Sequence, residues 1–353
     1  MIDSSKKIKT IAFAMKTKDS KFEKIEIERR ALKPSDVLIK IKYAGICHSD
    51  IHTARSEWGE CIYPIVPGHE IVGEVVSIGK KVNNFKIGDI AGVGCMVNSC
   101  QKCTNCKKGY EQNCKNGTVF TYNSLDIYDK NEPTYGGYSN YIVVNENFVI
   151  NVPKNAPLEF VAPLMCAGIT TYSPLAFSKI SKGQNVAVAG FGGLGVMAVK
   201  YAKKLGANVY VFARNNKKEK DAKKLGVKKL YTSLNDVKEE FDFIISTIPT
   251  NYDVMKYINL LKFGGEMCVL GVPPQDVNWS MNPSHLIFAN HKKIYGSLIG
   301  GIKLTQEMLD FSLKNKIYPE IEIIKPNKID DAYKKMTTGK GKFRYVIDMQ
   351  SVK

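Results

Sequence analysis

Cysteine and histidine side chains offer the clearest chemistry in this chain of 353 residues. Residues 45–52 read GICHSDIH and place Cys47, His48 and His52 within six positions. Neighbouring side chains point to opposite sides of a strand and to different faces of a helix, so Cys47 and His48 are not expected to share one metal ion. Any further ligands of such an ion must therefore come from other parts of the chain.

A second group consists of four cysteines, separated by two, two and seven residues: Cys100, Cys103, Cys106 and Cys114. Four thiolates on a loop rich in Gly, Lys and Asn can close around one tetrahedral Zn²⁺ and leave no open position. The chain has nine cysteines, an odd number, and its N-terminus does not read as a signal peptide, which favours metal over disulfides. The spacing therefore predicts a structural zinc site.

Three scattered residues could form a catalytic metal site. They are Cys47, His69 in a Gly68-His69-Glu70 turn, and Cys166 in PLMCAGITTYSP. Each alone is a weak signal, since a lone cysteine is commonly a small buried hydrophobe. Together they supply two thiolates and one imidazole, a set that leaves a fourth position for water or substrate.

A glycine-rich turn follows the apolar stretch 185–190 and opens a helix that is expected over 194–205. In this context glycines allow close backbone approach, and the helix N-terminus offers N–H groups and a positive dipole end to a pyrophosphate. The turn therefore predicts a dinucleotide site made by Gly190, Gly192, Gly193, Leu194 and Gly195.

The expected dinucleotide is NADP(H) rather than NAD(H). An NAD site usually has an acidic residue about 20 positions beyond the glycines. Here residues 212–218 read FARNNKK, and the first acid is Glu219. Arg214, with Asn215 and Lys218 nearby, can instead hold a 2′-phosphate, for which arginine offers planar bidentate donors.

The pattern of elements indicates two kinds of fold. Residues 8–150 alternate short strands with glycine turns, as in all-β domains, whereas strands and helices alternate after Pro163, as in a doubly wound parallel sheet. Strands are expected at 37–45, 70–79, 85–94, 136–152, 185–190, 208–213, 241–247, 266–272 and near 343–349, with helices at 194–205, around 253–262 and at 304–315.

Six motifs of this chain together resemble those of the zinc-dependent medium-chain alcohol dehydrogenases. They are GICHSDIH, PGHEIVGEV, the four-cysteine loop, LMCAGITTYSPL, AGFGGLG and YGSLIGG. They occur in that family's order, and the resemblance is greatest to its cinnamyl-alcohol-dehydrogenase branch. It implies an α/β protein, with a GroES-like β-barrel catalytic domain, a Rossmann domain with a doubly wound parallel sheet, and the active site in the cleft. The implied division is 1–157 for the catalytic domain with its zinc loop at 95–115, 158–296 for the NADP-binding domain, and 297–353 for a return to the catalytic domain.

The resemblance also implies roles for individual residues. Cys47, His69 and Cys166 would bind the catalytic zinc, and Glu70 would approach or replace its water. Asp50 would orient His69. Ser49 and His52 would relay a proton, a task that suits the ordinary histidine pKa of about 6.5.

Cofactor and substrate contacts follow in the same way. The resemblance implies that His48 and Arg344 face the cofactor pyrophosphate and that Thr170 touches the nicotinamide. The implied substrate pocket is lined by Trp58, Cys95, Phe120, Leu298 and Ile299. These residues are mostly apolar, which favours aromatic or medium aliphatic aldehydes over sugars and polyols.

The expected protein is thus a cytoplasmic, NADP(H)-linked alcohol dehydrogenase with two zinc ions per chain, and a homodimer paired near 292–299. No apolar run reaches the length of a membrane helix. An NAD-dependent alcohol or polyol dehydrogenase is the first alternative, disfavoured by the missing acid. A zinc-bearing nucleic-acid-binding protein is the second. The charge of +17 suggests it, but the lysines are spread along the chain and no reading helix adjoins the cysteine loop.

Overall fold

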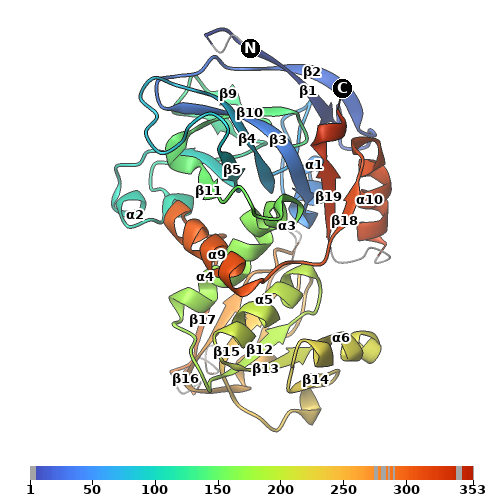
Figure 1. Cartoon of the computed structure of the whole chain (residues 1–353). Coiled ribbons are helices and arrows are strands. Elements are labelled where there is room, and N and C mark those ends of the chain that lie inside the picture. The colour runs from blue at the N-terminus through green and yellow to red at the C-terminus, as the bar shows by residue number, and fades with distance from the viewer. Residues whose placement is uncertain are drawn as a thin grey trace. The chain divides into compact units, whose positions relative to one another are not determined.

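The computed structural model divides the chain into two compact units (Figure 1). It describes residues 5–273, 277–279, 284, 287–288, 291–338 and 344–352. Unit 1 comprises Met1–Cys166 and Gly300–Lys353, and unit 2 comprises Ala167–Ile299. The chain passes from one unit to the other inside a single helical run, formed by α3 (Leu158–Pro163), a π-helical turn (Leu164–Gly168) and α4 (Ile169–Phe177).

The expectation that no apolar run reaches the length of a membrane helix is wrong, because among the described residues this helical run, Leu158–Phe177, is long and apolar enough to cross a membrane. However, 78% of its most apolar window is buried inside the protein. Packing within the fold therefore accounts for its apolar composition.

Unit 1 is built on a seven-stranded sheet with the long strand β3 (Asp36–Ile46) at its centre. The path through the sheet is β11-β5-β4-β3-β19-β18, and β10 also pairs with β3. The last two strands of the path come from the C-terminal part of the chain, so both ends of the chain contribute to one sheet. The strands are β4 (Ile71–Ile78), β5 (Ile90–Val93), β10 (Tyr141–Asn145), β11 (Ile150–Val152), β18 (Glu322–Ile324) and β19 (Tyr345–Asp348).

The other elements of unit 1 surround this sheet. A hairpin of β1 (Ile8–Ala14) and β2 (Glu23–Arg29) buries alternate residues of β1, as the two-residue period of a strand requires. A core that includes Ile39, Ile41, Val75 and Phe148 lies beneath the strands. The remaining elements are α1 (His48–Ala54), β6 (Met96–Ser99), α2 (Thr104–Lys107), β7 (Thr118–Phe120), β8 (Leu125–Asp126), β9 (Glu132–Pro133), α9 (Ile302–Asn315) and α10 (Ile329–Thr337).

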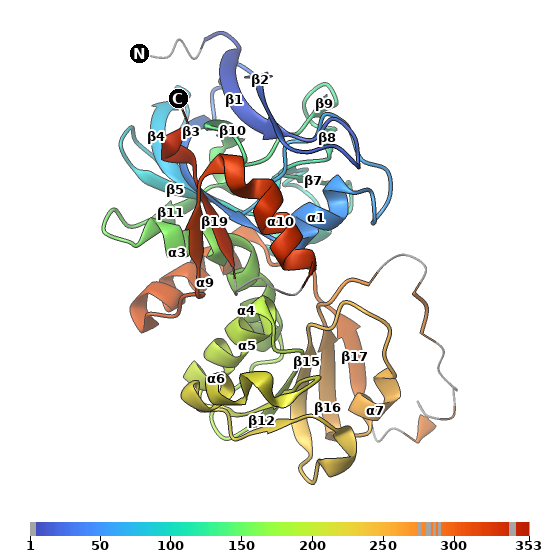
Figure 2. The same ribbon diagram turned by 90° about the vertical axis from the view of Figure 1, so that its right-hand side faces the viewer.

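Unit 2 is a six-stranded, wholly parallel sheet in the order β14-β13-β12-β15-β16-β17. The strand order reverses beside β12, and in such sheets ligands bind outside the carboxyl ends of the strands at that switch point. Figure 2 shows α5 and α6 on one face and α7 on the other. The elements are β12 (Asn185–Ala189), α5 (Gly193–Lys204), β13 (Asn208–Phe212), α6 (Glu219–Lys224), β14 (Lys229–Tyr231), β15 (Phe241–Ser246), α7 (Val254–Ile258), β16 (Leu261–Val269) and β17 (Lys293–Gly296).

Two expected elements are shorter than the sequence suggested. The expected strand 85–94 is reduced to β5, because Lys86 and Asp89 form a tight turn around Gly88, whose φ is +86°. The helix expected around 253–262 ends at Ile258, because Leu261 already pairs with Phe241 as the first residue of β16. Tertiary pairing overrides the local pattern in the second case.

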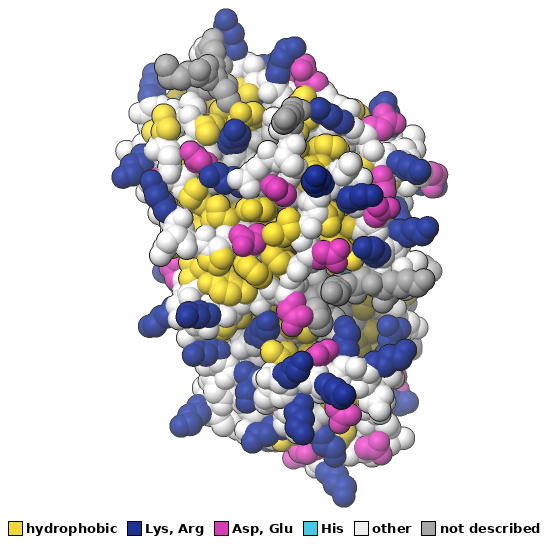
Figure 3. Space-filling view, turned by 45° about the vertical axis from the view of Figure 1, so that its right-hand side comes forward, with side chains coloured by type: hydrophobic (Ala, Val, Ile, Leu, Met, Phe, Trp, Pro, Cys, Tyr) yellow, Lys and Arg dark blue, Asp and Glu magenta, His cyan; other side chains and the backbone are white. Residues whose placement is uncertain are grey.

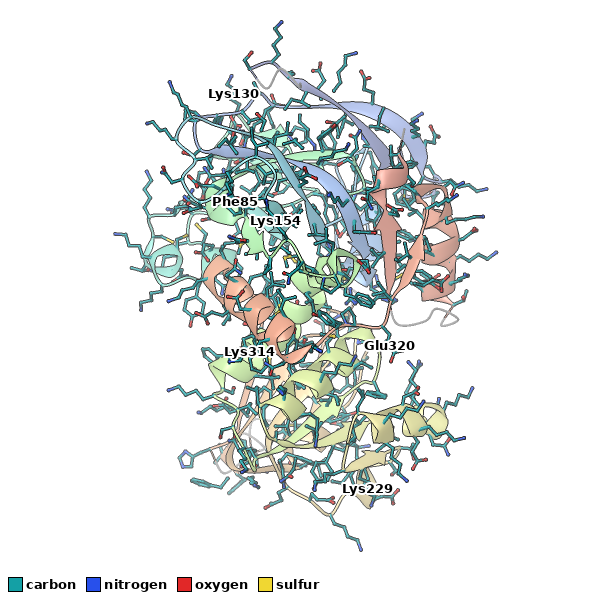
Figure 4. The ribbon with its side chains drawn as sticks, in the orientation of Figure 1. Phe85, Lys130, Lys154, Lys229, Lys314 and Glu320 are labelled. Carbon is teal, nitrogen blue, oxygen red and sulfur yellow. The ribbon has the colours of Figure 1, made fainter. Side chains whose placement is uncertain are left out.

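The chain carries a net charge of +17. Figure 3 shows basic side chains interspersed with acidic ones on the face it presents. Lys130, Lys154, Lys229 and Lys314 are exposed and extend away from the ribbon in both units (Figure 4). On that face, the charges suit a well-solvated surface rather than one continuous basic patch.

Candidate active site

Four buried side chains meet where β3 ends and β4 begins. They are Cys47, His69, Glu70 and Cys166, and their candidate ligand atoms lie within 4.8 Å of one another. The antiparallel pairing of β3 with β4 places the residues after β3 beside those before β4, and the Gly45 N–H donates to the Glu70 carbonyl at 2.8 Å. Cys166 joins them from the π-helical turn, a feature often found at functional sites. The structure therefore brings together the three ligands expected from the sequence.

This donor set fits a zinc ion. Two thiols and an imidazole are ligands that Zn²⁺ prefers, and three protein ligands leave one position open. A hydrogen bond from Cys166 lowers the pKa of Cys47 well below its ordinary value. The Glu70 Oε2 atom is buried and has no hydrogen-bond partner among the described residues. A bound cation or its water would satisfy that orphaned oxygen.

Asp50 holds the ligand residues together. Its carboxylate is fully buried and accepts four hydrogen bonds, two on each oxygen. The His69 Nδ1–H donates to Oδ1 at 3.0 Å and the Gly68 N–H at 3.2 Å, while the Cys47 N–H donates to Oδ2 at 2.8 Å and the Tyr138 hydroxyl at 3.1 Å. The bond to Nδ1 leaves the Nε2 of His69 free for a metal.

Glu70 shares its buried position with Arg344, whose guanidinium donates to Glu70 Oε1. Burial raises the pKa of Glu70 to about 8, although Arg344 opposes the shift. Gly45 makes room for this carboxylate, because a Cβ at that position would lie 2.0 Å from Glu70 Oε2. The expected placement of Arg344 against a cofactor is thus accompanied by an ion pair with Glu70 that the sequence did not predict.

Ser49 and His52 both lie on α1. The Cys47 thiol donates to the Ser49 hydroxyl at 3.5 Å, so this hydroxyl adjoins a proposed metal ligand. The His52 ring stacks on Trp58 with centroids 4.8 Å apart, and its Nδ1 bonds to the Glu57 carboxylate. The sequence analysis did not predict this contact of Glu57 with His52. An acidic residue five positions after a candidate relay histidine could have indicated it.

The four cysteines of the 95–115 loop form a second group that could hold a metal ion, again within 4.8 Å of one another. The Sγ atoms of Cys103 and Cys106 are 3.5 Å apart, and those of Cys100 and Cys106 are 3.9 Å apart. Backbone N–H groups of Lys102 and Cys103 lower the pKa of Cys100 to about 6. Burial raises the pKa of Cys106 to about 12, an effect that a coordinated cation would reverse.

The glycine turn lies at the carboxyl end of β12, beside the switch point of the unit 2 sheet. Gly190 has a φ of +92°, and a Cβ there would meet Thr247 Oγ1 at 2.6 Å. A Cβ on Gly195 would lie 2.0 Å from the Gly190 carbonyl oxygen, whereas one on Gly192 would meet no atom within 4 Å. Gly190 and Gly195 are therefore needed by the fold, while Gly192 faces the open space at the start of α5, beside Gly193 and Leu194.

The basic residues after β13 lie beside this turn. The Lys218 ammonium donates to the carbonyl of Phe191, in the middle of the glycine turn, at 3.3 Å. Arg214 and Asn215 are exposed, and the Asn215 side chain caps a short turn by accepting from the Lys217 N–H at 3.1 Å. No acidic residue precedes Glu219 in this segment.

The other candidates belong to one unit or the other. In unit 1, His48 is exposed, Phe120 is 39% exposed, and the Cys95 thiol lies within hydrogen-bonding reach of the Cys166 thiol. In unit 2, Thr170 is buried in α4, Leu298 is 49% exposed, and Ile299 is buried with a φ of +41°. Cys95, which was expected to line the substrate pocket, thus lies directly beside the candidate metal ligand Cys166.

Comparison with known families agrees with both units. Residues 33–154 match the alcohol dehydrogenase GroES-like domain family, and residues 193–314 match the zinc-binding dehydrogenase family. An NADP-dependent alcohol dehydrogenase C of Mycolicibacterium smegmatis is 45% identical over 350 residues, which cover 97% of this chain and 98% of that protein. The chain belongs to the zinc-dependent medium-chain alcohol dehydrogenases.

Within this alcohol dehydrogenase family, its relatives include the cinnamyl-alcohol-dehydrogenase branch, as the motifs indicated. The structure described as CAD from Helicobacter pylori complexed with NADP(H) is 58% identical, with a TM-score of 0.94, and covers 98% of this chain and 99% of that one. A cinnamyl alcohol dehydrogenase of Sorghum bicolor is 33% identical, with a TM-score of 0.92, over 98% and 99% of the two chains. The predicted family and its two-domain α/β fold are confirmed.

The two ligand groups of this alcohol dehydrogenase predict two zinc ions per chain. We expect Cys47→Ser to leave one zinc and no measurable activity, because it removes a ligand from the open site but leaves the four-cysteine loop intact. Metal analysis of the purified protein by mass spectrometry, with circular dichroism to confirm folding, measures this. Cys61→Ser is the matched control, since Cys61 is half-buried and outside both groups. Two zinc ions in the folded Cys47→Ser variant would contradict the assignment.

Proposed function

We propose that the protein is a cytoplasmic, zinc-dependent NADP(H) alcohol dehydrogenase that interconverts aromatic or medium aliphatic aldehydes and their alcohols. The observation that carries this proposal is the buried group of Cys47, His69 and Cys166, oriented by Asp50. The names of relatives support it, since they include NADP-dependent alcohol dehydrogenases, a probable formaldehyde dehydrogenase of Bacillus subtilis and a cinnamyl alcohol dehydrogenase of Rauvolfia serpentina.

The chemistry divides between the bound groups and the chain. Zinc held by Cys47, His69 and Cys166 would supply a Lewis acid for the substrate oxygen, and NADP(H) would supply or accept the hydride. The chain's own task is to orient these groups and to move one proton. Asp50 fixes the His69 ring, and Arg344 holds Glu70 next to the ligands.

Ser49, His52 and Glu57 form the proton path that we propose. During alcohol oxidation, the Ser49 hydroxyl would take the substrate proton and pass its own to His52. Glu57 fixes the orientation of the His52 ring through its bond to Nδ1. Glu57 also lines a cavity of about 500 Å³ together with Lys18, Arg55 and Tyr333, so the proton can reach solvent there.

The relay predicts a graded loss of alcohol oxidation. We expect His52→Gln to lower kcat near neutral pH about 100-fold, in the range typical of general acid–base groups. Glu57→Gln keeps the shape but removes the charge, so its loss should be smaller, about tenfold. Steady-state rates from pH 6 to 9 and NADP binding by fluorescence measure the two effects. Wild-type kcat at neutral pH in His52→Gln would exclude the relay, and a parallel loss of NADP affinity would assign His52 to the cofactor instead.

The preference for NADP(H) rests on the segment after β13. Arg214 is exposed, no acid competes for the ribose, and Lys218 is tied to the glycine turn through Phe191. A guanidinium can bind a 2′-phosphate by two parallel hydrogen bonds. An NAD-dependent alcohol or polyol dehydrogenase remains the alternative function, and the same segment argues against it.

Arg214→Ala is therefore expected to raise KM for NADPH roughly 10- to 100-fold, because it removes the charge-assisted hydrogen bonds to the 2′-phosphate. The KM for NADH should change little, because NADH lacks the 2′-phosphate. Initial rates with both cofactors and one aldehyde measure the ratio. Equal catalytic efficiency with both cofactors in the wild type would overturn the NADP preference.

Two glycine variants separate cofactor binding from folding. Gly192→Ala should keep the melting temperature but weaken NADPH binding, since its new methyl group enters only open space at the turn. Gly195→Ala should instead lower the free energy of unfolding by about 1–3 kcal/mol, because its Cβ overlaps the Gly190 carbonyl. Thermal melts and NADPH titrations measure both. Unchanged NADPH affinity in Gly192→Ala would remove the turn from the cofactor site.

We also propose a homodimer paired through β17. In the described part of the chain this strand pairs with β16 alone, and its outer edge is open. Phe177, at the end of α4, is 63% exposed. Its ring packs against that of Tyr295 in β17, with ring centroids 5.4 Å apart. Sedimentation velocity tests the proposal, and a monomer at micromolar concentration would refute it.

The substrate class is tested by a screen of NADPH oxidation before and after chelation. It should compare benzaldehyde and cinnamaldehyde with short aliphatic aldehydes and ketones. Activity that is greatest with aromatic aldehydes and lost after chelation supports the proposal. Activity that survives removal of both zinc ions would indicate a zinc-free reductase.

A further inference from the structure

A buried line of polar groups runs from α10 to the candidate metal ligand His69. The Tyr333 hydroxyl donates to the Tyr138 hydroxyl at 3.4 Å, and the Tyr138 hydroxyl donates to Asp50 Oδ2 at 3.1 Å. The other oxygen of Asp50 accepts from His69 Nδ1 at 3.0 Å. Tyr138 is 0% exposed and Tyr333 is 4% exposed, so bulk solvent does not compete for these bonds.

The direction of the line is set by the Asp50 carboxylate, which only accepts hydrogen bonds. The pKa of Tyr138 lies well above its ordinary value because the side chain is buried and faces the Asp50 carboxylate. Its hydroxyl therefore keeps its proton and can always donate to Asp50. A hydrogen bond to a charged acceptor contributes more than one between neutral groups, typically about 1.5–3 kcal/mol.

The Tyr138 side chain is also held against the turn that carries His69. Its backbone N–H donates to the Pro67 carbonyl at 2.9 Å. Its ring lies so close to Gly68 that a Cβ there would be 2.7 Å from Cδ1 of the ring, and Gly68 has a φ of +106°. Phe22 packs against both tyrosines, with ring centroids 5.9 Å from Tyr138 and 5.1 Å from Tyr333. The hydroxyl of Tyr138 thus has little freedom to leave Asp50.

From this geometry we propose that Tyr138 is a positioning residue for the catalytic zinc. Its hydroxyl holds Asp50, and through Asp50 it holds the His69 imidazole in the orientation that binds the metal. Tyr333, on α10, in turn fixes the Tyr138 hydroxyl through its hydrogen bond. The inference rests on the proposed metal-binding role of Cys47, His69 and Cys166.

Removal of the hydroxyl has a definite local consequence. In Tyr138→Phe, Asp50 Oδ2 would keep only the bond from the Cys47 N–H, so the carboxylate could turn away from His69. Groups that orient a metal-bound histidine typically change metal affinity or activity about 10- to 100-fold. The ring, its contact with Gly68 and its packing on Phe22 would remain.

The test measures the rate at which zinc passes from the folded holoprotein to a chromophoric chelator. Tyr138→Phe should release zinc from the catalytic site about tenfold faster or more. Release from the four-cysteine site should be unchanged, which provides an internal reference. Tyr333→Phe should have a smaller effect in the same direction. Tyr63→Phe is the control, since its hydroxyl bonds to the Ala54 carbonyl on α1 at 2.8 Å and does not contact Asp50.

A double-mutant cycle separates positioning from a general loss of stability. In an Asp50→Asn background, Tyr138→Phe should add little to the release rate, because both changes break one connection. Independent, multiplicative effects would overturn the inference, as would a wild-type release rate in Tyr138→Phe. If the wild type holds only the zinc of the four-cysteine loop, the proposed catalytic site fails before the tyrosine is at issue, so the two failures are distinguishable.

Discussion

The site of unit 1 depends above all on one buried carboxylate, that of Asp50. An ionised carboxylate away from water is costly unless hydrogen bonds replace its hydration. Here donors from Cys47, Gly68, His69 and Tyr138 fill both oxygens. The need to satisfy Asp50 therefore fixes the turn before α1, the turn before β4 and the His69 ring at the same time. A loss of any donor disturbs the others, because they share one acceptor.

Buried polar contacts also connect the C-terminal part of the chain to the N-terminal part. Arg344 precedes β19 and bonds to Glu70 across 274 positions, while Tyr333 on α10 bonds to Tyr138 across 195 positions. Both residues come from the C-terminal return that adds β18 and β19 to the central sheet. The surroundings of the candidate metal site are thus complete only when this return has folded onto the N-terminal strands. Contacts of such large sequence separation are costly in loop entropy and form late in general.

Sequence reasoning succeeded where the chemistry is local. The spacing of Cys100 to Cys114 and the strand–turn–helix setting of Gly190 to Gly195 place those groups together by chain geometry alone. The distant set of Cys47, His69 and Cys166 was predicted from its residue types and from the order of the motifs, and the structure brings the three side chains together. Glu57, Tyr138 and Tyr333 were missed, because a buried tyrosine has no periodic signature and ordinary core packing explains it equally well. The shortened helix at α7 has a similar cause, since the pairing of Leu261 with Phe241 is invisible in local propensity.

The position of Cys166 shows how one helix serves two purposes. Its backbone belongs to a π-helical turn, and the turn is followed directly by α4, whose Thr171 hydroxyl donates to the Ala167 carbonyl at 2.7 Å. Cys166 is the last residue of unit 1 before the chain enters unit 2. A wider turn inside a helix redirects a side chain without ending the helix, so Cys166 can face His69 while the same helix continues to Thr170.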